Sequence, residues 1–172
     1  MGDLSRNVRE TPGEQGECIG LLIPSVGGIL IEDNSVLLVK RRNPPCKGFW
    51  SIPGGRQKPG ESASEAIVRE MLEETGLVVE PVGVFGVIEL IPRKQVEEHY
   101  VIVEFILRRV SGSLRAGSDA EDARFFPMDN LPRNTGLATR EMVGELLNPG
   151  RGFLNNCCRY KVFQIEHLCE TI

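Results

Sequence analysis

Apolar residues alternate or run together in short stretches over most of the chain, a pattern typical of β-strands. β-branched, apolar runs cover 26–31 and 35–40, and the polar residues 32–34 between them favour a turn, so these runs predict a hairpin. Two longer apolar runs predict strands joined by a polar loop, at 82–91 and 100–110. Shorter strands are expected at 18–23 (closed by Pro24), 49–52, 123–127 and, as an edge strand, 160–165.

The hydrophobic period changes to that of a helix over 62–74. Its apolar residues share one helical face: Ala63, Ala66, Ile67 and Met71. Residues 61–62 suit a helix start and Thr75-Gly76 suits a helix end. A second helix is predicted over 139–147. Strands, a helix, strands and a helix in this order favour an α/β fold of one domain, with a mixed sheet flanked by helices.

The two ends of the chain differ from this central part. Residues 1–17 are rich in charge, Gly and Pro, and we expect a flexible N-terminal arm there. The folded domain is expected at 18–150, followed by a C-terminal extension at 151–172 whose role the sequence does not indicate.

Composition excludes several classes of protein. The 172 residues are 41% apolar and 26% charged, as in an ordinary soluble domain. The net charge of −4 argues against a protein held on long nucleic acid by phosphate attraction. No apolar run reaches the roughly 18–20 residues of a membrane helix, and the polar N-terminus lacks the apolar core of a signal peptide, so a cytoplasmic protein is expected.

Five cysteines are an odd number and show no CxxC spacing. In the expected compartment disulfides are rare, so we interpret all five as reduced thiols rather than zinc ligands. They are Cys18, Cys46, Cys157, Cys158 and Cys169.

Acidic residues crowd the C-terminal end of the first predicted helix. Glu70 and Glu74 lie about 40° apart around the axis, and Glu73 lies about 60° to the other side. Like charges at this spacing repel, and the helix dipole is unfavourable to anions at this end. A solvated acidic face is one interpretation, and a site for a hard cation such as Mg²⁺ or Mn²⁺ is the other. The turn Pro53-Gly54-Gly55 favours the second, because its backbone can approach a metal closely.

These residues belong to a longer motif. Gly55-x5-Glu61-x7-Arg69-Glu70-Met71-x-Glu73-Glu74-x-Gly76-Leu77 resembles the Nudix box, GX5EX7REUXEEXGU, where U is aliphatic. Met71 departs mildly from the usual Leu, Ile or Val. Weaker similarity to small MutT-like members, resembling ADP-ribose pyrophosphatases, extends over about 26–147. The resemblance implies a Nudix-type α/β/α sandwich with a mixed sheet, and a Nudix hydrolase domain at 18–150.

The resemblance also implies an activity and its residues. Nudix enzymes hydrolyse a nucleoside diphosphate linked to another moiety, and cations must screen such a substrate. Mg²⁺ is the expected cofactor, with Mn²⁺ as an alternative. The metal ligands would be Glu70, Glu73, Glu74 and the Gly54 carbonyl, while Arg69 orients a glutamate and Glu61 supports Arg69. A homodimer is expected from the resemblance alone.

The group that deprotonates the attacking water stays open. A box glutamate is one candidate, and the other is an acid of a later loop, of which we favour Asp119 and Asp122, although a polar turn explains them equally well. Arg41 and Arg42 either meet phosphates or form an ordinary charged strand end. Trp50 and Tyr100 either stack on a base or belong to the core.

Three functional hypotheses follow. The first is Mg²⁺-dependent hydrolysis of ADP-ribose or a related nucleotide sugar. The second is a nucleoside triphosphate pyrophosphohydrolase, including one that removes oxidised nucleotides, and cap or dinucleotide hydrolysis would use the same box. The third is a catalytically silent module that senses a nucleotide, which is disfavoured because all the box carboxylates are present.

Overall fold

The structure, a computed structural model, describes residues 21–44, 46–92, 98–117, 119–148 and 159–169. Its strands are β1 (Leu22–Glu32), β2 (Ser35–Arg41), β3 (Trp50–Ser51), β4 (Gly54–Arg56), β5 (Leu77–Ile91), β6 (His99–Gly112), β7 (Ala120–Pro127) and β8 (Arg159–Gln164). Its helices are α1 (Ala63–Thr75), α2 (Leu137–Leu147) and the short 3₁₀ helix η1 (Ile165–His167). The expected arm at 1–17 lies outside the described residues.

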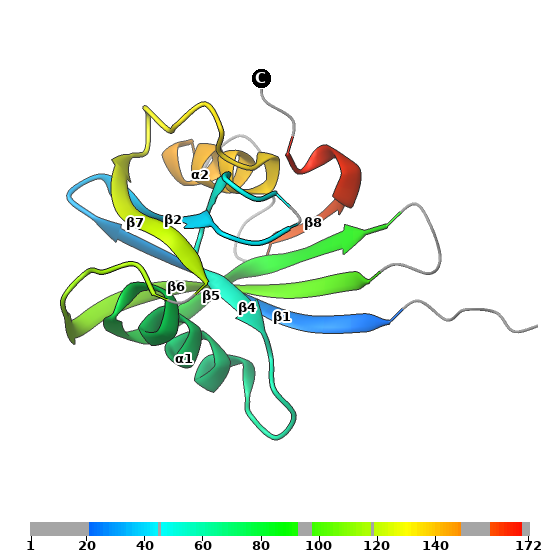
Figure 1. Cartoon of the computed structure of the whole chain (residues 1–172), viewed down its shortest axis with the longest axis horizontal. Coiled ribbons are helices and arrows are strands. Elements are labelled where there is room, and N and C mark those ends of the chain that lie inside the picture. Colours follow the sequence, from blue (N-terminus) through cyan, green and yellow to red (C-terminus); the bar gives the residue numbers. More distant parts are fainter. Residues whose placement is uncertain (1–20, 45, 93–97, 118, 149–158, 170–172) are drawn as a thin grey trace, which may run out of the picture.

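The strands form a mixed sheet with the order β3-β2-β1-β6-β5-β8, while β4 pairs with β1 and β7 with β2. β1 is parallel to β6 and β5 to β8, and the other pairs are antiparallel. α1 covers one side of the sheet and α2 the other (Figure 1). This arrangement confirms the expected α/β sandwich.

Each helix closes a separate core. Between α1 and the sheet, Ile67 and Met71 pack with Val26, Leu37 and Phe105. On the opposite side, α2 and the C-terminal segment pack against the sheet, and the main buried residues there are Ile29, Trp50, Ile88, Met142 and Phe163. Both cores depend on β1, whose alternate residues face opposite sides.

The predicted hairpin is confirmed as β1 and β2, joined at Asp33 and Asn34. Both turn residues have positive φ, 47° and 58°, the conformation that suits the right-handed twist of a two-residue hairpin. The boundary expected at Pro24 is wrong, because β1 continues through it. Pro24 is aligned with Val101 in the parallel ladder, and its carbonyl accepts from the Gln57 N–H at 3.0 Å.

Other boundaries also differ: β7 begins at Ala120 instead of 123, and α2 at Leu137 instead of 139. β5 begins at Leu77, five residues before the apolar run that predicted it, and register shifts near Pro81 and Val84 bend it. The segment expected only as a turn at Gly54 also forms the short strand β4 against β1. The edge strand expected at 160–165 is confirmed as β8, beside β5.

A disulfide joins Cys46 to Cys169, with their Cα atoms 5.4 Å apart, so the interpretation of these two residues as reduced thiols is wrong. They are 123 residues apart, and only the fold brings them together. The chain after β8 returns to the start of α2, where the Leu137 N–H donates to the Leu168 carbonyl at 3.1 Å. The other three cysteines lie outside the described residues.

Ile67→Asp should prevent folding, whereas Leu72→Asp on the same helix should not. Ile67 is fully buried and the new carboxylate would have no partner, a cost of several kcal/mol. Leu72 is 49% exposed, so its replacement should change the free energy of unfolding by about 0.5 kcal/mol or less. Circular dichroism and urea titration of both variants check this, and a folded Ile67→Asp protein would contradict the assigned core.

Cys169→Ser should lower the free energy of unfolding of the oxidised protein by roughly 2–5 kcal/mol, because the bridge closes a long loop. Urea titration with and without reductant provides the control, since the variant should not respond to reductant and the wild type should fall to its level. Free thiols at both positions in the air-oxidised protein, seen by peptide mass mapping, would rule the bridge out.

Candidate active site

Helix α1 holds the acidic motif in place through well-defined ends. Ser62 caps its N-terminus, where its hydroxyl accepts from the Glu65 N–H at 3.2 Å and the Glu65 carboxylate accepts from the Ser62 N–H at 2.8 Å. Gly76 ends the helix in the left-handed conformation (φ 70°). The predicted helix at 62–74 is therefore confirmed to within one residue. Its buried face fixes the rotation that turns the glutamates away from the core.

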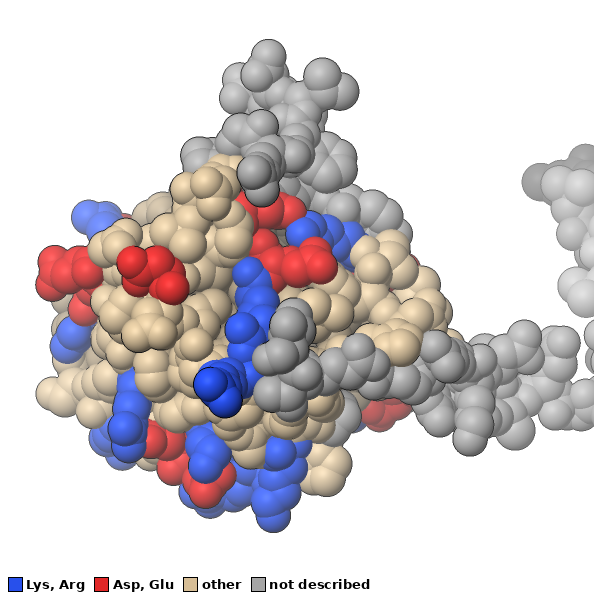
Figure 2. Space-filling view, turned by 90° about the horizontal axis from the view of Figure 1, so that it is seen from above, with Lys and Arg blue, Asp and Glu red and all other residues tan. Residues whose placement is uncertain are grey.

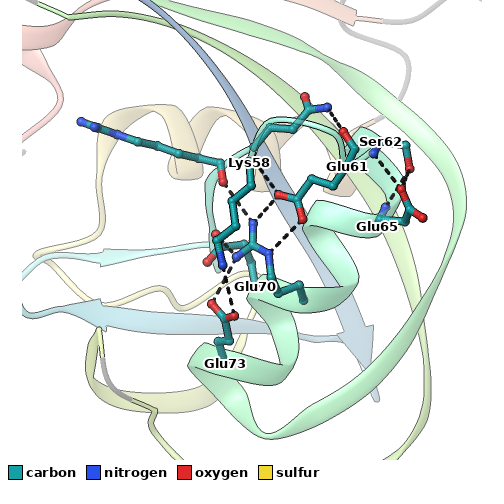
Figure 3. A network of polar contacts seen from close by, with 9 residues as sticks. Lys58, Glu61, Ser62, Glu65, Glu70 and Glu73 are labelled. Atoms are coloured by element: carbon teal, nitrogen blue, oxygen red, sulfur yellow. Dashed lines mark hydrogen bonds and ion pairs between the residues drawn. The ribbon is translucent and has the colours of Figure 1, made fainter.

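Arg69 is the centre of the polar network on α1, and Figure 3 labels its partners Glu61, Glu70 and Glu73. Its Nε and Nη2 donate to the two carboxylate oxygens of Glu61, at 3.0 and 2.6 Å. Its Nη1 donates to Glu70 at 2.6 Å and to Glu73 at 3.1 Å, and Nη2 also donates to the Arg56 carbonyl at 3.1 Å. All five donors of the guanidinium are thus used. One side chain ties the loop before α1 to two glutamates of the helix.

The glutamates lie against the short strand β4. Glu74 accepts a hydrogen bond from the Gly54 N–H at 3.0 Å. The Glu70 carboxyl lies over Gly55, where a Cβ would come within 2.6 Å of it, so position 55 has room only for glycine. Glu73 is more exposed and lies 3.7 Å from the Lys58 ammonium. Figure 3 shows Glu61 on the loop before α1 and Glu70 and Glu73 on the helix, with Lys58 reaching toward Glu73.

The protonation of these groups differs with their surroundings. The hydrogen bonds from Arg69 hold the pKa of Glu61 down to about 2. Burial raises the pKa of Glu70 despite Arg69. Burial also raises the pKa of Glu74 to about 7, and the charges of Glu70 and Asp119 add to this, while the Gly54 N–H and the Arg41 charge oppose it. Negative charge is therefore costly at the buried positions of the cluster.

The donor set suits a hard divalent cation. Among the described residues no three acidic, histidine or cysteine side chains converge on one point as they stand, because Arg69 attracts Glu70 and Glu73 while Gly54 attracts Glu74. The donors nevertheless are all oxygens, as Mg²⁺ and Mn²⁺ prefer. A cation would also relieve the buried acidic charge that raises the pKa of Glu70 and Glu74.

A pocket of about 720 Å³ extends from these glutamates across β4 to the space between the sheet and α2. The candidate residues that line it are Gly54, Arg69, Glu70, Glu73, Glu74, Arg41, Arg42, Trp50, Tyr100 and Asp119. Glu61 and Asp122 do not line it. Glu61 connects to the pocket through Arg69.

The two acids favoured as bases lie in different places. Asp119 lines the pocket and is close enough to Glu74 for its charge to affect that carboxyl. Asp122 lies on β7, where it pairs with Arg124 at 2.7 Å and accepts from the Ala123 N–H. Arg42 donates to the Ala120 carbonyl at 3.0 Å, so the end of β2 and the start of β7 are joined beside the pocket.

The two aromatic candidates have different environments. Trp50 is 7% exposed and packs edge-on against Phe126, with ring centroids 4.7 Å apart, so it belongs to the core while it lines the pocket. Tyr100 accepts from Arg56 at 3.1 Å through its hydroxyl, which also donates to Glu98. The Arg56 guanidinium lies 5.7 Å from the centre of the Tyr100 ring. Arg56 and Glu98 thus fix the position of Tyr100 in the wall of the pocket.

One pocket residue was missed in the sequence analysis. Glu104 lies in the middle of β6, is 3% exposed and lines the pocket. Burial raises its pKa to about 8. The sequence did contain a signal for this residue, because Glu104 is the single acid inside the apolar run that predicted the strand. An acid on a buried face is expected only if it has a partner or a function.

Figure 2 shows one face, on which basic side chains run through the middle and gather along the lower side with acidic side chains among them, while other acidic side chains lie in the upper half. None of the described helices has the length and apolar character needed to cross a membrane.

Similarity to known proteins is extensive. The NUDIX domain family model matches residues 21–146. An ADP-ribose pyrophosphatase of Methanocaldococcus jannaschii is 43% identical over 109 residues, which are 63% of this chain and 64% of that protein. The mouse 8-oxo-dGDP phosphatase NUDT18 is 34% identical over 147 residues, 83% of this chain and 43% of that protein. The chain thus matches less than two thirds of the length of these relatives.

The fold has close counterparts among solved structures. A MutT NUDIX hydrolase from Burkholderia pseudomallei superposes with a TM-score of 0.67 and 28% identity, over 73% of this chain and 98% of that one. The family model covers well over half of the chain and includes the whole motif from Gly55 to Leu77. The chain therefore belongs to the Nudix family.

Proposed function

We propose that this protein hydrolyses a nucleoside diphosphate linked to another moiety, with ADP-ribose or a related nucleotide sugar as substrate and Mg²⁺ as cofactor. The observation that carries the proposal is a single pocket with a cluster of carboxylates at one end and an apolar, aromatic space at the other. A diphosphate would lie at the first end and a base at the second. The similarity to an ADP-ribose pyrophosphatase supports the choice of substrate.

The residues of the chain have distinct roles in this proposal. Glu70, Glu73, Glu74 and the Gly54 carbonyl would hold the cation, with Mn²⁺ as the alternative to Mg²⁺. When bound, the cation supplies charge neutralisation for the diphosphate and polarises water. Arg69 keeps Glu70 and Glu73 on one side of the helix, and Glu61 keeps Arg69 in place.

The remaining candidates act on the substrate or on water. Asp119 is the favoured later-loop acid for removing the proton of the attacking water, because it lines the pocket beside Glu74 and Asp122 does not. A box glutamate remains the alternative. Arg41, Arg42, Trp50 and Tyr100 line the pocket. In this proposal the two arginines contact the diphosphate, and the two aromatic residues contact the nucleoside.

A second candidate is hydrolysis of an oxidised nucleotide. The similarity to an 8-oxo-dGDP phosphatase over 83% of the chain favours it, and the same cluster would serve. A silent nucleotide sensor is disfavoured because every carboxylate of the motif is present. A cytoplasmic location and a homodimer stay predictions.

The first test is a hydrolysis panel of ADP-ribose, sugar nucleotides, dinucleoside polyphosphates, and normal and oxidised nucleotides. Release of AMP from ADP-ribose should exceed hydrolysis of the others and should stop when EDTA removes the divalent cation. Preference for 8-oxo nucleotides would establish the second candidate instead. A folded protein that cleaves nothing would refute hydrolysis and favour the sensor.

Glu73→Gln and Glu74→Gln should lower kcat by two or more orders of magnitude, because each removes a charged ligand from the proposed cation site. The fold should persist, since each change also removes repulsion between neighbouring carboxylates. Glu65→Gln is the matched control on the same helix, where the amide can keep the capping box. Equal kcat values for wild type and the Glu73 and Glu74 variants would refute the assigned site.

A further inference from the structure

Glu104 lines the pocket and has no partner among the residues that the structure describes. Its side chain is 3% exposed, its Oε2 is fully buried, and neither oxygen has a hydrogen bond or an ion pair with any residue that the structure describes. A buried carboxyl without a partner costs several kcal/mol relative to water. Such a group in a pocket wall is explained if a ligand supplies the missing hydrogen bonds.

The sheet makes room for this side chain. Both cross-strand neighbours of Glu104 are glycines, Gly27 in β1 and Gly86 in β5. A Cβ on Gly27 would lie 2.1 Å from Oε2 of Glu104. The carboxyl therefore stands in a niche between two residues without side chains.

The carboxyl lies on the pocket side, opposite to α1. Gly28, the next residue of β1, faces Ile67 of α1, so Gly27 and the carboxyl above it face the other way. Around this part of the pocket the lining is mostly apolar and comes from β5, β6 and α2, including Ile88, Ile102 and Met142. A mostly apolar space with a carboxyl in its wall suits a planar base read along one edge.

The distance from the carboxylate cluster also suits a nucleotide. Gly54, Gly27 and Glu104 are aligned in the adjacent strands β4, β1 and β6. The backbones of β4 and β6 are therefore about 10 Å apart, on the scale of a nucleoside monophosphate, and the Glu104 carboxyl leans back over Gly27 between them. The Gly54 N–H donates a hydrogen bond to Glu74, so the row of residues from Gly54 to Glu104 begins at the proposed cation site.

We infer that Glu104 recognises adenine, with its O–H donating to N1 and its carbonyl oxygen accepting from the N6 amine. The inference rests on the proposed function and names the base that the same pocket selects. Burial keeps the acid neutral near pH 7, so it offers one donor and one acceptor side by side. A phosphate, by contrast, would bring a negative charge into an apolar part of the pocket.

The test measures binding without turnover. AMP and purine riboside 5′-monophosphate, which lacks the N6 amine, are titrated calorimetrically into wild type, Glu104→Gln and Glu104→Leu. Wild type should bind AMP about tenfold more tightly, the value of one buried hydrogen bond. Glu104→Gln, whose amide offers the same donor and acceptor, should keep most of this preference, and Glu104→Leu should lose it.

Several outcomes would overturn the inference. Equal affinities of wild type for the two nucleotides would do so without any variant, as would failure of AMP to bind at millimolar concentration. An AMP preference that survives in Glu104→Leu would place the recognition elsewhere. Melting temperatures show that the variants are folded, and Glu104→Leu should be at least as stable as wild type because it removes the buried carboxyl.

Kinetics separate this inference from the proposed function. With ADP-ribose, Glu104→Leu should raise KM about tenfold and leave kcat within a few-fold, since the residue lies away from the carboxylate cluster. Absence of any hydrolysis by wild type would refute the proposed function, whereas the AMP preference would still be measurable. Hydrolysis with an unchanged KM in Glu104→Leu would refute only the role of Glu104.

Discussion

The candidate site depends on the hydrogen bonds that the Arg69 guanidinium donates. It fixes the side chains of Glu61, Glu70 and Glu73 and the backbone of Arg56, so the loop before α1 and the exposed face of α1 form one unit. A lysine has a compact ammonium in place of this planar fork and cannot make the bidentate contact with Glu61. Without such a centre, neighbouring glutamates would turn away from one another into solvent.

One end of the pocket is lined by carboxylates and the other end is mostly apolar, and the two ends lie on opposite sides of the sheet. Glu70 lies against Gly55 on the side of α1, whereas Glu104 lies against Gly27 on the side of α2. One pocket is lined by both carboxyls and by the short strand β4, so one ligand can reach both. In this arrangement the proposed cation site is built on a helix and the proposed base site on the sheet.

The local features were predictable and the long-range ones were not. The helical period and the capping residues are visible in a short stretch of sequence, so α1 and its row of glutamates could be predicted to within one residue. The motif likewise located the acids around Arg69. Cys46 and Cys169 are paired only by the return of the chain to α2, which no local pattern encodes. The difference between Asp119 and Asp122 depends on which side of the β7 start each side chain faces, and the niche around Glu104 depends on strand register.

The niche at Gly27 has a consequence for how this sequence can change over evolutionary time. Gly27 does not adopt a positive φ, so its backbone would accept other residues, and only the space taken by Glu104 excludes them. A side chain at position 27 is therefore compatible only with a shorter residue at position 104, whereas position 104 can change alone. A relative with a side chain at the first should carry a shorter residue at the second, and would lack the acid proposed here to read the base.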